Sequence, residues 1–227
     1  IKKFGRARRG WLGVRIQKVT KALAECLGLE KARGALVLGV STDGPAEKAK
    51  IKAGDVILNF DGKPIKEMRA LPRIVAETDV GKYLRVEVWR KGKLITLFAK
   101  LGEFPAEQKD LANRIGGKNG DTVGTLKVLG MSLSKINDRI RLKFKLDKKV
   151  IGVIVIGVDS ESTAARKNVR PGSIIRKIGS DQKVVRTPEE IKQIVQKARK
   201  AKLKNLFFLI ETGGQSFGVA LPLQGER

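Results

Sequence analysis

The fold of this chain is decided by GALVLGVSTDGPAEKAKIKAGDVI, residues 34–57, because the chain contains this pattern twice. Residues 152–175 read GVIVIGVDSESTAARKNVRPGSII and follow the first stretch position by position. In each copy a glycine opens a β-branched strand. A polar loop, a short helix and a glycine turn then lead to a second apolar strand. At roughly 120 residues, the repeat is far longer than a solenoid unit of about 20–50 residues, so it predicts two copies of one domain.

Each copy continues with an amphipathic helix. Three apolar residues at positions i, i+3 and i+4 form a single stripe on it: Leu71, Ile74 and Val75 in the first copy, and Ile191, Ile194 and Val195 in the second. Such a stripe packs on a core or lines a groove. In the second copy, Thr187 as N-cap, Pro188 at N1 and Glu190 at N3 form a capping box, which predicts where the helix begins.

The other segments of the first copy predict a mostly β domain. The expected strands lie near residues 13–19, 35–40, 55–60, 84–90 and 93–101, and the expected helices near residues 45–50 and 71–78. DGKP at 61–64 predicts a tight turn, and RKGK at 90–93 predicts a hairpin. The fold class is therefore mainly β with short helices (α+β), as two partly open β-barrels, each capped by two helices.

The repeat divides the chain into a first domain at 1–102, a linker at 103–126 and a second domain at 127–227. The linker is polar, and we expect a short helical segment near 106–114. It contains GGKNGD at 116–121. That stretch has no buried strand before it and no Ser/Thr-headed helix after it, so it does not fit a phosphate-binding loop.

The 227 residues carry a formal charge of +25, spread evenly over both halves. Such a surface favours acidic partners without specifying them, so binding to nucleic acid or to an anionic envelope surface is an alternative function. Only two Trp and one Tyr are present. That scarcity weakens the case for binding single-stranded nucleic acid by base stacking.

The residue types exclude several chemistries. The chain contains no His, which excludes His-dependent triads and His-metal sites within it, and we expect no cofactor and no metal site. The single cysteine, Cys26, lies in an apolar helical pattern and is expected to be a small core residue. The longest apolar run, residues 150–158, is too short for a membrane span. The chain opens at Ile1 without Met and with no signal peptide, so we expect a piece of a longer protein.

The stretch RRGWLGVRIQ, residues 8–17, predicts a binding site. Its glycines surround two large apolar residues and lead into an alternating strand. We expect that strand to expose a backbone edge beside the helix stripe, where an extended peptide can pair by β-augmentation. The turn before the strand would aim N–H groups at the terminal carboxylate of the peptide, with Arg8 and Arg9 adding positive potential. The candidate peptide-binding residues are Trp11, Leu12, Gly13, Val14, Ile16, Leu71, Ile74 and Val75.

At these residues the sequence resembles a known family. Trp11-Leu12-Gly13-Val14 is similar to the carboxylate-binding loop of PDZ domains in bacterial HtrA proteases, and GDVILNFDGKPI at 54–65 is similar to their most recognisable segment. The second copy resembles a PDZ domain too, although Val128 stands where the first copy has Trp11. A tentative second groove would use Leu129, Gly130, Met131, Leu133, Ile191, Ile194 and Val195.

The resemblance implies tandem PDZ domains from a DegP-like periplasmic serine endopeptidase whose catalytic His, Asp and Ser belong to an upstream domain. This chain would then be no enzyme. It would be a regulatory module that captures unfolded or C-terminal peptide segments for the protease domain of its parent chain and aids assembly of a homo-oligomer. No specific nucleic acid and no membrane span are expected.

Overall fold

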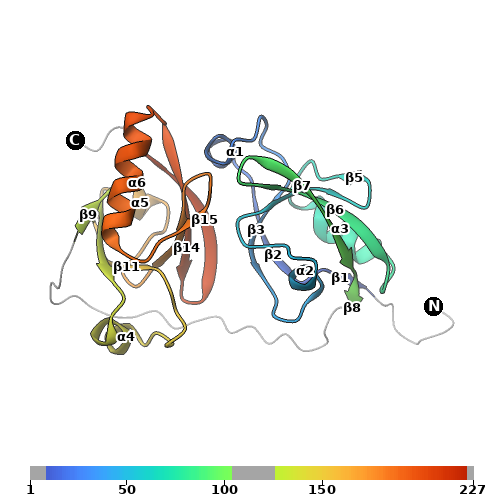
Figure 1. The fold of residues 1–227 in the computed structure, drawn as a ribbon, viewed down its shortest axis with the longest axis horizontal. Helices are drawn as coiled ribbons and strands as arrows, with labels where there is room; N and C mark the ends of the chain where they lie inside the picture. Colours follow the sequence, from blue (N-terminus) through green and yellow to red (C-terminus); the bar gives the residue numbers. More distant parts are fainter. Residues whose placement is uncertain (1–8, 104–125, 224–227) are drawn as a thin grey trace. The chain divides into compact units, whose positions relative to one another are not determined.

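The computed structural model describes residues 9–103 and 126–223. The chain folds as two compact units, each built around its own sheet (Figure 1). Arg8, the helical segment expected near 106–114 and the GGKNGD stretch lie outside the described residues.

The first unit has a sheet in the order β2-β3-β4-β6-β7, with β5 added to β4, and a separate pair formed by β1 and β8. The expected long strands and both expected helices are confirmed within a few residues. The elements are β1 (Gly10–Trp11), β2 (Val14–Lys18), α1 (Lys21–Leu27), β3 (Ala35–Val40), α2 (Pro45–Lys48), β4 (Val56–Phe60), β5 (Lys63–Pro64), α3 (Ala70–Glu77), β6 (Tyr83–Arg90), β7 (Lys93–Lys100) and β8 (Gly102–Glu103).

The second unit repeats this order, with a sheet β15-β14-β12-β11-β10-β9 and β13 added to β12. Both units carry an irregularity at matching places, between Ile57 and Asn59 on β4 and between Ile175 and Lys177 on β12. The elements are β9 (Leu126–Val128), β10 (Met131–Lys135), α4 (Asp138–Phe144), β11 (Val153–Val158), α5 (Thr163–Arg166), β12 (Ile174–Ile178), β13 (Lys183–Val184), α6 (Pro188–Lys200), β14 (Asn205–Thr212) and β15 (Gln215–Pro222).

Local signals explain many element ends. Asp61-Gly62 and Lys91-Gly92 have positive φ at both residues, the geometry that joins two strands through a two-residue turn. Thr187 caps α6 by accepting from the Glu190 amide at 3.4 Å. The Glu190 carboxylate in turn accepts from the amide of Arg186, one residue before the cap.

Within residues 9–103 and 126–223, each unit has three helices where the sequence pattern predicted two. The helices that were not assigned, α1 and α4, follow β2 and β10 and are only seven residues long. An apolar helical pattern around Cys26 indicated α1, although it was not counted among the expected helices, and seven residues give only a weak periodic signal. Cys26 lies on α1 and is half-buried, not fully inside the core as expected. Burial raises the pKa of its thiol to about 12, so little thiolate forms at neutral pH.

A buried ion pair connects β4 to β6 in the first unit. The Arg90 guanidinium donates from Nε to Asp55 Oδ1 and from Nη2 to Asp55 Oδ2, both at 2.7 Å. The Asp55 side chain is 1% exposed, and Oδ2 also accepts from the amide of Lys52 at 2.7 Å. The hydrogen bond that Arg90 donates to Asp55 raises the pKa of the guanidinium. Asp55 therefore has a structural role.

At the matching position, the second unit has uncharged side chains in place of the ion pair. Ser173 stands where the first unit has Asp55, and its Oγ lies 2.6 Å from Thr212 Oγ1, where the first unit has Arg90. Ser173 Oγ also accepts from the amide of Arg170 at 3.0 Å. A pair of neutral hydroxyls thus replaces a bidentate ion pair between two copies of one domain.

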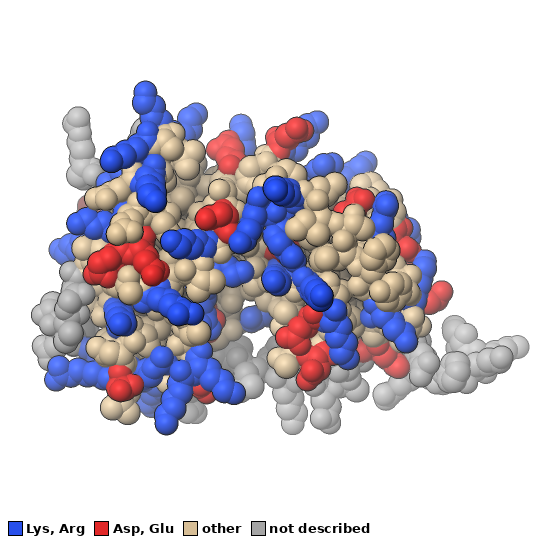
Figure 2. All heavy atoms as spheres, viewed as in Figure 1, with Lys and Arg blue, Asp and Glu red and all other residues tan. Residues whose placement is uncertain are grey.

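Basic side chains cover much of the visible face of both units (Figure 2). Acidic residues are interspersed in smaller groups on the same face. In the described ranges, no helix combines the length and the apolar character needed to cross a bilayer.

Candidate functional site

Strand β2 is the last strand of its sheet, and within residues 9–103 no other strand pairs with its outer side. Two observations show which residues present backbone groups there. Both backbone groups of Val37 on β3 point toward the β4 side: its amide donates to Asp55 O, and its carbonyl accepts from the amide of Gly54. Ile16 is the partner of Val37 on β2, so this is a pair without hydrogen bonds between the two residues. The amide and carbonyl of Ile16 therefore point away from β3. The Ser41 amide donates to Gly13 O, so the carbonyl of Gly13 faces β3. Because the backbone groups of successive strand residues point to opposite sides, those of Val14 point outward. Val14 and Ile16 therefore offer backbone groups to an added strand.

The loop before β2 presents backbone amides at the end of this edge. Gly13 adopts φ +76°, a left-handed conformation that favours glycine. The carbonyl of Leu12 is turned away, because it accepts from the amide of Ala46 at the start of α2 at 2.9 Å. Within the described part of the chain, the amides of Leu12 and Gly13 have no hydrogen-bond acceptor. Two neighbouring N–H groups without partners form an anion-binding feature.

The segment leading into this loop is held away from β2. Gly10 and Trp11 pair with β8, and β1 lies against α3. A Cβ on Gly10 would lie 2.2 Å from the carbonyl oxygen of Val75 and 2.6 Å from that of Thr78, so only glycine permits this approach. The Trp11 ring packs beside Gly13, at 3.2 Å from where a Cβ would be. The two glycines around Trp11-Leu12 therefore have different causes, close packing for Gly10 and a turn for Gly13.

A cavity of about 340 Å³ lies between β2, its loop and α3. Seven of the eight candidate residues line it, and Ile74 does not. Arg9, expected to add positive potential here, also lines it, and three further residues, Gly10, Pro72 and Ala76, were missed from the sequence. The lining consists of Arg9, Gly10, Trp11, Leu12, Gly13, Val14, Ile16, Leu71, Pro72, Val75 and Ala76.

The orientation of α3 explains which residues were missed. Leu71 and Val75 are 1% and 7% exposed, so they belong to the core and also border the cavity. Ile74 packs against the core from outside the cavity, contrary to the sequence expectation. Pro72 and Ala76, at i and i+4, form the neighbouring stripe that borders the cavity. A small residue at Ala76 is a weak sequence signal, because it fits a groove and an ordinary helix surface equally.

In the second unit the matching strand edge is already occupied. Strand β9 pairs antiparallel with β10, placing Val128 opposite Met131 and Leu126 opposite Leu133, and β9 also contacts α6. The hydrogen bonds on the inner side of β10 follow the pattern seen beside β2. The Val155 amide donates to Ser173 O, and its carbonyl accepts from the amide of Gly172. The Asp159 amide donates to Gly130 O. The chain's own segment therefore fills the place that is open beside β2.

The tentative second groove is consequently not an open one. Leu129 and Gly130 have φ of +50° and +70° and form a two-residue turn that folds β9 back onto β10. Lys127 stands where the first unit has Gly10, and a Cβ at the Gly10 position would clash with helix backbone. Ile194 is partly buried and packs on the core. The other candidates are buried in the core cluster itself: Leu129, Met131, Leu133, Ile191 and Val195.

The described residues hold no group of three or more His, Cys, Asp or Glu side chains that could bind a metal ion. Asp61 has its carboxylate 2.6 Å from Lys82 Nζ and lies in the turn after β4. The polar chemistry gathered at the cavity is therefore that of backbone amides and of Arg9.

The chain is similar to several known proteins. Residues 10–101 match the PDZ domain family. The chain is 34% identical over 221 residues to a probable periplasmic serine endoprotease DegP-like of Bartonella henselae, covering 96% of this chain and 41% of that protein. A protein of the same name from Rhizobium meliloti is 34% identical over 227 residues, with 97% and 42% covered.

Among solved structures, the HtrA-type protease AlgW with decapeptide is 38% identical, with a TM-score of 0.43, and the match covers 46% of this chain and 32% of that one. The chain thus spans less than half the length of the curated relatives it matches. The matched part is the PDZ region of those proteins and not their protease domain. Residues 10–101 are a PDZ domain, and over nearly its whole length the chain is related to the PDZ-containing region of proteins named DegP-like serine endoproteases.

Proposed function

We propose that the first unit binds extended peptides that end in an apolar residue with a free carboxylate. The observation that carries this proposal is the open edge of β2, which ends at the unpartnered amides of Leu12 and Gly13 and borders an apolar cavity. A peptide strand would pair with Val14 and Ile16, and main-chain bonds would supply affinity for many sequences.

The ends of the site suggest how a peptide is oriented. Its carboxylate would accept from the amides of Leu12 and Gly13, with the positive charge of Arg9 at the same cavity. Its last side chain would enter the space beside Leu71, where burial of an apolar group is favourable. Peptides that end in a charged residue would lose this contribution.

C-terminal amidation is expected to weaken binding by about 1–3 kcal/mol, because it removes the charge that the loop amides stabilise. The comparison uses one peptide in free-acid and amide forms, titrated against the 227-residue chain. Trp11 borders the cavity, so Trp fluorescence can follow the titration directly. Equal affinities for the two forms would contradict the role of Leu12 and Gly13.

We also propose that the second unit takes no peptide along β10, because β9 fills that edge. Calorimetric titration of the whole chain with the free-acid peptide is therefore expected to give one peptide per chain. A stoichiometry of two would show that β9 is displaced under binding conditions. Peptide binding by the first unit is expected in either case. The proposal for the second unit can therefore fail without affecting the proposal for the first.

In the whole protein, we infer that this module delivers unfolded or C-terminal segments to a serine protease domain and aids assembly of a homo-oligomer. The relatives are named periplasmic endoproteases, which supports a periplasmic location and a proteolytic parent. The proposed division is a first PDZ domain at 1–102, a linker at 103–126 and a second domain at 127–227. The nucleic-acid alternative predicts steep loss of binding with salt, whereas apolar groove binding changes little.

A further inference from the structure

The segment formed by α4 and the loop after it, residues 138–151, exposes apolar side chains. It is called the α4 knuckle below. Leu142 is 82% exposed, the highest value among the large apolar residues found on the described surface, and Ile151 is 49% exposed. Neither residue lines the peptide cavity of the first unit. Single apolar side chains are often partly exposed on protein surfaces and need no explanation. A leucine that is almost entirely exposed on an ordered helix, with a second exposed apolar residue nearby, indicates a binding surface.

The α4 knuckle is an ordered feature. Asn137 caps α4 by accepting from the amide of Ile140 at 2.9 Å, and Ile140 is buried. Arg141 donates to the carbonyls of Asp147 at 2.7 Å and Val150 at 3.1 Å, which holds the loop to the helix. The exposure of Leu142 therefore follows from a defined local structure.

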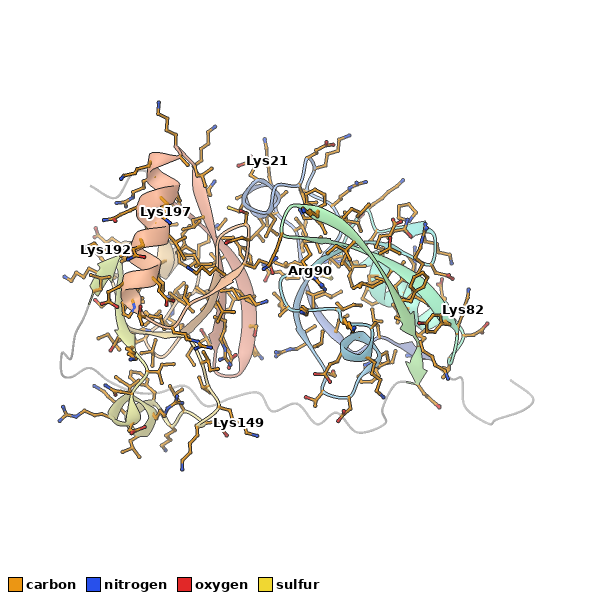
Figure 3. The ribbon with its side chains drawn as sticks, viewed as in Figure 1. Lys21, Lys82, Arg90, Lys149, Lys192 and Lys197 are labelled. Atoms are coloured by element: carbon orange, nitrogen blue, oxygen red, sulfur yellow. The ribbon has the colours of Figure 1, made fainter. Side chains whose placement is uncertain are left out.

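Basic side chains surround the exposed leucine. Arg139 lies one turn before Leu142 on the same face, and Lys145 lies one turn after it. No described ion pair neutralises the cations at Arg139, Lys145, Lys148 or Lys149. Figure 2 shows blue side chains gathered over α4 at the lower left, and Lys149 extends outward in Figure 3.

The matching segment of the first unit lacks both properties. Helix α1 buries Leu23. Residues 21–33 carry three basic side chains against Glu25 and Glu30, whereas the α4 knuckle carries six against Asp138 and Asp147. The two units therefore place a helix at the same point of the fold, but only the second carries exposed apolar and basic side chains together. Packing of the shared fold does not require this combination, because α1 does without it.

We propose that the α4 knuckle binds the surface of an anionic phospholipid bilayer. Lys and Arg side chains attract acidic headgroups, while an apolar side chain between them enters the interface. A bilayer fits better than a nucleic acid, because Leu142 offers no ring on which a base could stack. It also fits a projecting leucine, since soft lipid can surround the side chain without a preformed pocket. Such attachment would hold the peptide-binding unit beside a membrane without a spanning segment.

The test is flotation of the 227-residue chain with two kinds of vesicle, phosphatidylcholine alone and phosphatidylcholine with phosphatidylglycerol. We expect binding at physiological salt to the anionic vesicles only. A variant with Arg139→Gln, Lys145→Gln, Lys148→Gln and Lys149→Gln is expected to bind roughly six-hundredfold more weakly, because each lost cation costs roughly fivefold. Leu142→Gln is expected to weaken binding about tenfold, because it removes the apolar insertion.

The matched control removes the same charge from exposed lysines at or just after α6: Lys192→Gln, Lys197→Gln, Lys200→Gln and Lys202→Gln. This variant has the net charge of the α4 variant and is expected to bind anionic vesicles nearly as well as the unaltered chain. Three outcomes would overturn the proposal: no binding of the unaltered chain to anionic vesicles, equal losses in the two charge variants, or unchanged binding by Leu142→Gln. If the chain does not bind anionic vesicles but is retained on duplex DNA, the first of these outcomes holds and a nucleic-acid partner is favoured.

Discussion

Arg90→Thr is expected to lower the free energy of unfolding of the first unit by about 3–5 kcal/mol, because it leaves the Asp55 carboxylate buried without its cation. Both tryptophans of the chain, Trp11 and Trp89, belong to the first unit. Urea unfolding followed by Trp fluorescence therefore reports the stability of this unit alone. The expected result is a large fall in the denaturant midpoint.

The second unit supplies the control for this experiment. Adding Asp55→Ser to Arg90→Thr reproduces the hydroxyl pair of Ser173 and Thr212. The double variant is expected to recover most of the loss, since no buried charge remains and both hydroxyls find a partner. If the double variant is as unstable as Arg90→Thr, the cost arises from lost packing of the Arg90 side chain and not from an unpaired carboxylate.

Ala76→Glu is expected to weaken peptide binding by about 3 kcal/mol, roughly a hundredfold, while the unit stays folded. Ala76 borders the cavity but does not belong to the core cluster. Its new carboxylate is hydrated in the free protein and is desolvated only when a peptide covers it. Peptide titration and urea unfolding of the same variant measure the two effects separately.

The same helix provides two comparisons for Ala76→Glu. Ala70→Glu makes the identical change outside the cavity lining and is expected to leave both affinity and stability nearly unaltered. Ile74→Glu places a carboxylate against the core and is expected to lower stability. Lost binding in Ala70→Glu, or unchanged binding in Ala76→Glu, would move the peptide site away from this face of α3.

Much of the fold and most of the candidate site follow from local sequence. The repeat predicted two copies of one domain, the glycine pairs predicted their turns, and Thr187 marked the start of α6. The loop from Trp11 to Val14 was found because Gly13 needs a left-handed backbone, which is a property of one residue. These features depend on near neighbours in the chain, so one sequence is enough to predict them.

The face of α3 was less predictable. A stripe at i, i+3 and i+4 shows that one side of a helix is buried, but it does not fix the rotation of the helix about its axis. Packing on the sheet decided that Ile74 contacts the core and that Ala76 borders the cavity. The cavity lies along the helix that the sequence indicated, and Ile74 lies outside its lining.

The sequence by itself determined the two related domains, their strands and the loop that ends at β2. Only the tertiary structure decided that the first unit has an open edge and the second a filled one. Val128 in place of Trp11 indicated that the two units differ. Which segment pairs with the edge strand, however, depends on competition between segments that are distant in the chain. Where Gly10 lets β1 approach α3, β1 pairs with β8 and leaves β2 open. In the second unit Lys127 stands at the Gly10 position, and β9 contacts α6 but pairs with β10. Hydrogen bonds at a strand edge go to whichever segment the packing brings there, and local residue patterns do not specify that segment.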